Sequence, residues 1–67
     1  MNNSIGVELT AGQAGLVECY DRLAEILGND ADLAPFERRN ALKALAALWQ
    51  VANGLDMDRG HIYHLGA

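Results

Sequence analysis

The stretch PFERRNALKALAALWQVAN, residues 35–53, decides the fold, because it is the longest uninterrupted helical pattern in the chain. Its alanines and leucines are strong helix formers, and Pro35 suits a first helical turn, where its missing N–H would have no partner. Gly54 is a natural left-handed residue at the end of a helix. The pattern predicts a helix over about 34–53.

The apolar residues of this helix gather on one face that spans more than about 100° of its circumference. A face of that width can meet two neighbours at once. One side of it would contact the rest of this chain, and the other side, with Leu42 and Trp49, would contact a second chain. The centre of the face is formed by Ala41, Leu45, Leu48 and Ala52, with Leu42 and Trp49 on one flank and Ala44, Val51 and Leu55 on the other.

A second helix is predicted over about 11–27. Thr10 and Gln13 have the spacing of a capping box, in which each side chain accepts the backbone N–H of the other residue. We expect Glu18 and Arg22, four residues apart, to form an ion pair, and Gly28 to end the helix. The apolar stripe of this helix comprises Leu16, Val17, Tyr20, Leu23, Ala24 and Leu27, with Cys19 and Ile26 on its shoulder.

The two helices are joined by a short polar connection, NDADLA at 29–34, in which Asp30 or Asp32 is expected to cap the second helix. A connection of about six residues between amphipathic helices indicates an antiparallel hairpin. The predicted fold class is therefore all-α, with a single small helical domain over 1–67 and short extended or partly ordered termini.

The termini are less regular than the helices. Residues 1–9 are predicted to form an extended arm, because Ile5, Val7 and Leu9 recur at strand spacing. The arm could pair with a second copy, pair with the C-terminal residues, or lie across the helices. Residues 55–67 form an apolar C-terminal tail.

The length of the chain, 67 residues, limits its unaided stability. A domain near this size buries only about 60% of the surface of its unfolded chain, and stability above about 3–5 kcal/mol is unusual. The lone Cys19 excludes an intrachain disulfide, and no Cys/His cluster has zinc-site spacing. Association is the expected supplement, as a homodimer in which two hairpins make a four-helix arrangement.

Four residues are the predicted contacts with a protein partner. Trp, Tyr and Arg are the residue types that most often dominate binding energy, and Arg38 shares a helix flank with Leu42 and Trp49. Arg38 could instead lay its stem on apolar surface while its head reaches water. The predicted partner-binding residues are Arg38, Leu42, Trp49 and Tyr63.

Composition disfavours several functional classes. The net charge is −4, and five Lys and Arg residues are too few to track a phosphate backbone, so direct nucleic-acid binding is disfavoured. No apolar run approaches the roughly 20 residues of a membrane helix, and the N-terminus lacks the basic region of a signal peptide. One cysteine without a targeting segment fits a reducing cytoplasm.

No residue pattern indicates catalysis, a cofactor or a metal site. Cys19 is expected to be a small buried hydrophobe rather than a nucleophile, since no basic residue adjoins it. His61 and His64 are three residues apart, as on one helical face, but no third metal ligand is evident. Gly12 and Gly15 lack the context of a phosphate loop, and we expect them to allow close packing or to loosen the first helical turn.

These features favour a small protein-binding regulator or inhibitor, of a bacterial or phage type, that docks on a larger protein through an apolar helical face. The alternative is a structural or accessory subunit, permanently assembled with an enzyme or with copies of itself. A regulator should be folded and soluble alone, whereas an obligate subunit should fold poorly without its partner.

Overall fold

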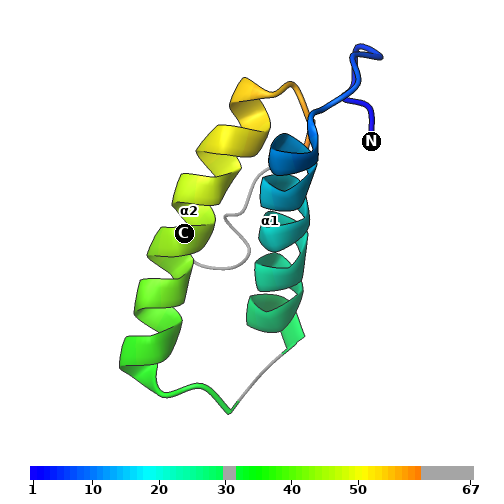
Figure 1. The fold of residues 1–67 in the computed structure, drawn as a ribbon. Coiled ribbons are helices and arrows are strands. Elements are labelled where there is room, and N and C mark those ends of the chain that lie inside the picture. The colour runs from blue at the N-terminus through cyan, green and yellow to red at the C-terminus, as the bar shows by residue number, and fades with distance from the viewer. Residues whose placement is uncertain (30–31, 60–67) are drawn as a thin grey trace.

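The computed structural model describes residues 1–29 and 32–59. Two helices, α1 (Ala11–Asn29) and α2 (Pro35–Gly54), lie side by side and run antiparallel (Figure 1). This confirms the predicted helical hairpin. Within the described ranges the only β-pairing is one isolated bridge between Asn2 and Glu8.

The start of α1 matches the predicted capping box. The Thr10 N–H donates to Gln13 Oε1 at 2.9 Å, and the Gln13 N–H donates to Thr10 Oγ1 at 3.2 Å. The predicted end at Gly28 is wrong, because the helix continues through it to Asn29. The Asn29 side-chain amide donates to the Glu25 carbonyl oxygen at 3.1 Å, and so satisfies one of the carbonyls that a helix end leaves unpaired.

The start of α2 differs from the prediction. Ala34, rather than Asp30 or Asp32, occupies the N-cap position, and Pro35 is the first helical residue. The Ala34 N–H donates to Glu37 Oε1 at 2.7 Å. Alanine has no side-chain acceptor, so only this half of a capping box forms.

The end of α2 also differs. Gly54 is still helical, and the residue with left-handed backbone is Asp56, at φ 60°. Asp tolerates this conformation better than most residues because its short side chain can bond locally. The Leu55 N–H bonds to the Val51 and Ala52 carbonyls at 3.0 and 3.2 Å, which closes the last helical turn.

Two buried clusters hold the helices together. The cluster nearer the connection contains Tyr20, Leu27 and Leu45, and Leu45 is fully buried. The cluster nearer the chain termini contains Leu9, Val17, Ala52 and Met57. Residues predicted at the centre of the α2 face therefore do form the core.

Residues 1–9 fold back on themselves instead of extending. Gly6 has φ 86°, a left-handed value that favours glycine, and the Leu9 N–H donates to the Met1 carbonyl at 2.8 Å. Asn3 Nδ2 donates to the Leu55 carbonyl at 3.0 Å, and the Ser4 N–H donates to the Asp56 carbonyl at 2.9 Å. This segment is thereby attached to the residues that follow α2.

Neither α1 nor α2 is long and apolar enough to cross a membrane, and the described residues contain no other helix.

Candidate interaction surface

One side of the hairpin is covered by its own packing, and we call it the closed side. It carries Asp21 of α1 and Leu42 and Trp49 of α2. Leu42 and Trp49 are half-buried and pack against the cluster of Tyr20, Leu27 and Leu45. Their contact with a second chain, predicted from sequence, stays a prediction. Tyr63 lies outside the described residues.

Arg38 binds within its own chain. Its side chain is half-buried, and Nη1 donates to the Leu27 carbonyl oxygen at 3.0 Å. A cation at this place complements the partial negative charge at the C-terminal end of α1. Arg38 therefore ties the start of α2 to the end of α1, which is a structural role that sequence reasoning did not identify.

An ion pair lies on the same side, at the end of the described chain. Arg59 Nη2 lies 3.0 Å from Asp21 Oδ2. Tyr20 is buried next to this pair, and its pKa is raised, first by burial and then by the negative charge of Asp21, while Arg59 lowers it. The described chain thus leaves the hairpin over the closed side.

The opposite side keeps apolar residues exposed, and we call it the open side. Each helix has a line of residues that contacts the other helix. Because the helices run antiparallel, residues that lie in the same direction of rotation from that line fall on the same side of the hairpin. Leu16 is 44% exposed and Val51 is 37% exposed. Cys19 is exposed, so the prediction of a small buried hydrophobe is wrong. The open side is formed by Leu16, Cys19 and Ile26 of α1 and by Ala44, Ala47 and Val51 of α2.

A groove of about 560 Å³ runs along the α1 part of the open side. Its lining combines apolar residues with two charged ones, Glu18 and Arg22, which share one edge because they are four residues apart. Leu23, which also packs against the core, lies in the groove next to Cys19 and Ile26. The lining residues are Gly15, Glu18, Cys19, Arg22, Leu23 and Ile26.

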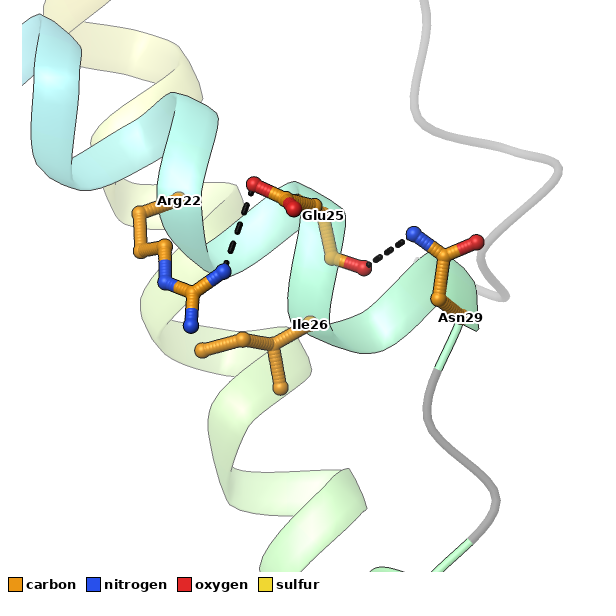
Figure 2. Close-up of a pocket in the computed structure, with 4 residues that line it drawn as sticks. All are labelled: Arg22, Glu25, Ile26 and Asn29. Atoms are coloured by element: carbon orange, nitrogen blue, oxygen red, sulfur yellow. Dashed lines mark hydrogen bonds and ion pairs between the residues drawn. The ribbon is translucent and has the colours of Figure 1, made fainter.

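A second, smaller hollow of about 170 Å³ lies at the end of α1, among Arg22, Glu25, Ile26 and Asn29 (Figure 2). The predicted Glu18–Arg22 ion pair is replaced here by one between Arg22 Nη1 and Glu25 Oε2, at 3.3 Å. Figure 2 shows the Ile26 side chain on the same side of the helix as the Arg22 guanidinium. The charged edge and the apolar surface are therefore adjacent.

The shape of these hollows fits a protein partner better than a small ligand. A small-molecule site usually encloses most of its ligand, whereas the described residues that line both hollows all belong to α1. Within the described ranges, no three His, Cys, Asp or Glu residues come together as metal ligands. His61 and His64 lie outside those ranges.

Sequence reasoning placed the outward apolar surface on the Leu42 and Trp49 flank and did not identify the open side. A signal was present, because Cys19 and Ile26 are seven residues apart on the shoulder of the α1 stripe and Val51 lies on the far flank of α2. Which flank is covered depends on contacts between segments far apart in the chain, and helical periodicity does not contain that information.

Comparison of the chain with protein families, with curated proteins and with solved structures finds no match.

Proposed function

We propose that this chain is a small protein-binding regulator that self-associates and docks on a larger protein through apolar helical surface. The observation that carries the proposal is the open side of the hairpin. Leu16 and Val51 remain 44% and 37% exposed on the same side as the exposed Cys19, Ala44 and Ala47.

Two further observations support a protein partner. The apolar lining of the α1 groove is bordered on one edge by the charged side chains of Glu18 and Arg22, and apolar surface next to polar residues is common in protein interfaces. A chain of 67 residues also has little stability to spare, and association would add to it.

The alternative proposal is a structural or accessory subunit of a larger assembly. The same exposed apolar side supports it, because a permanent interface is also apolar. The two proposals differ in the behaviour of the isolated chain. A regulator is helical and monodisperse alone, whereas an obligate subunit loses helicity or aggregates. Far-UV circular dichroism and light scattering on the same sample distinguish these results.

The docking surface is tested with two neighbouring substitutions on α2. Val51→Glu places a charge on the open side, and Gln50→Glu places the same charge on an exposed polar position beside it. A partner captured by the wild-type chain from cells is identified, purified and titrated with each variant. We expect Val51→Glu to weaken binding at least tenfold and Gln50→Glu to leave it unchanged.

The regulatory part is tested on the purified partner. Its own activity is measured with and without the wild-type chain, and with Val51→Glu as the matched control. Equal binding by the two variants contradicts docking through the open side. A partner activity that is the same with and without the chain contradicts a regulator and favours the accessory subunit.

A further inference from the structure

The α1 groove has two halves of different size. Gly15 lies in its N-terminal half, Leu23 and Ile26 lie in its C-terminal half, and Cys19 lies between them. Gly12 precedes the groove by about one helical turn. Small side chains leave a depression at one end, and bulky side chains make a ridge at the other. A surface of this kind is complementary to itself when a second copy is placed upon it in the opposite direction.

Packing among the described residues does not require these glycines. A Cβ built on Gly12 or on Gly15 meets no atom within 4 Å, and neither residue has the left-handed backbone that favours glycine. Glycine in a helix interior is less favourable than alanine by about 1 kcal/mol. Two such residues in the first turns of α1 therefore destabilise the isolated hairpin, and close approach by another backbone would explain their presence.

We propose that a second copy of this chain packs on the groove, with the two α1 helices antiparallel and the two-fold axis beside Cys19. In this register Gly12 lies opposite the partner subunit's Ile26, and Gly15 lies opposite the partner subunit's Leu23. The large half of each helix fills the small half of the other. This inference rests on the self-association in the proposed function and assigns the helix that carries it.

Charge complementarity supports a second copy of the chain as the partner that packs on the groove. The chain has a net charge of −4, so two copies repel unless opposite charges meet at their contact. In the proposed register Arg22 comes within about 3 Å, measured along the helix axis, of the level of the partner subunit's Glu18. Arg22 and Glu25 form their ion pair with side chains 68% and 61% exposed, so Arg22 can turn toward the partner without breaking a buried contact.

The end of the described chain does not lead to this groove. Arg59 is held by Asp21, which is two positions from Cys19 and therefore on the opposite face of α1. The groove points partly away from α2, so a copy bound there leaves Ala44, Ala47 and Val51 available to a different protein. Self-association then uses the α1 part of the open side, and docking on a larger protein uses its α2 part.

The first test compares two glycine-to-leucine substitutions. Gly15→Leu fills the depression, whereas Gly54→Leu changes a glycine on α2 whose added Cβ also meets nothing within 4 Å. Sedimentation equilibrium over a dilution series gives the dimer dissociation constant for each protein. We expect a wild-type dimer, a dissociation constant raised at least tenfold by Gly15→Leu, and little change with Gly54→Leu. Helicity of Gly15→Leu should not fall, because leucine favours helix over glycine.

The second test uses the wild-type thiol and stays decisive even when Gly15→Leu does not fold. A mild oxidant accepts two electrons and two protons from two Cys19 thiols, and the two sulfurs form one disulfide. We expect a Cys19–Cys19 linked dimer to form rapidly at concentrations where the chain is dimeric, and slowly when it is diluted. A monomeric wild-type chain, or a dimer that neither crosslinks nor responds to Gly15→Leu, overturns the proposal. In the latter case the chain still self-associates, but through another surface. Binding of the larger protein is tested separately, with Val51→Glu.

Discussion

The closed and open sides of the hairpin carry similar apolar residues in the sequence, but the fold places these residues in different environments. On the closed side Leu42 and Trp49 pack against the core, and Arg59, the last described residue, is held there by its ion pair with Asp21. On the open side Leu16 and Val51 remain exposed. The difference shows that a two-helix chain can cover apolar residues on one side with its own packing while apolar residues on the other side stay exposed.

The comparison also separates residues that bond within the hairpin from residues that stay at its surface. Arg38 has the residue type of a binding hot spot, yet its guanidinium bonds to the Leu27 carbonyl. Cys19 and Ile26 have no such signature, yet they line the groove. Residue type alone therefore does not show whether a side chain bonds within its own chain or lies at the surface.

The largest expected difference in the free energy of unfolding is between a leucine-to-alanine substitution on the closed side and one on the open side. Leu42→Ala removes a side chain packed against the core and should lower the free energy of unfolding by about 2 kcal/mol. Leu16→Ala removes a side chain that is 44% exposed and should lower it by less than about 1 kcal/mol. Urea unfolding at one fixed protein concentration gives both values. Equal losses would contradict the distinction between the sides.

The next comparison is between the stabilities of two variants, one substituted at Arg38 and one at its neighbour Arg39. Arg38→Met keeps much of the aliphatic part of the side chain and removes the hydrogen bond to the Leu27 carbonyl oxygen. The free energy of unfolding should fall by about 1 kcal/mol, which is less than for a fully buried hydrogen bond from a charged group. Arg39→Met changes an exposed arginine and should have little effect. Thermal unfolding of both variants checks this. If the two melt alike, the Arg38 bond contributes no stability.

The Asp21–Arg59 ion pair should have a smaller effect. A double-mutant cycle with Asp21→Asn and Arg59→Gln is expected to give a coupling of about 0.5 kcal/mol, because both side chains are partly exposed. The coupling should shrink in high salt, which screens exposed charges. A coupling of zero in low salt would mean that the ion pair does not stabilise the attachment of Arg59 to the closed side.

The smallest expected effect is a loss of folding stability at alkaline pH. The pKa of Tyr20 is higher in the folded chain than its ordinary value of about 10, so the folded state keeps the phenol proton that the unfolded state releases. Stability is therefore complete below about pH 10 and declines as the pH rises toward the folded-state pKa. The urea midpoint of the wild-type chain should fall relative to Tyr20→Phe between about pH 9 and pH 11. A constant difference across that range would contradict the raised pKa.

Much of the secondary structure was predictable because its signals are local. The capping box of Thr10 and Gln13 and the period of the two helices depend on residues within one or two turns of each other. The helix ends were predicted less well. Gly28 and Gly54 are helical, because side-chain and backbone bonds from Asn29 and Leu55 satisfy carbonyls in the last turns without a left-handed glycine.

The candidate site was predictable only in part. Helical spacing shows that each helix has more apolar surface than a single neighbour can cover, and the small size of the chain indicates association. It does not show that Asn3 and Ser4 bond to Leu55 and Asp56, or that Arg59 reaches Asp21. Those contacts join residues far apart in the chain.

The sequence by itself determined two amphipathic helices, the short connection that makes them antiparallel, and an excess of apolar surface. These follow from periodicity, propensity and length, which are properties of neighbouring residues. Only the tertiary structure decided which side of the hairpin is covered and that Arg38 has an internal partner, while Cys19 is exposed. The physical reason is that burial depends on contacts between distant segments, and an apolar residue on a helix flank has the same local pattern whether such a segment covers it or not.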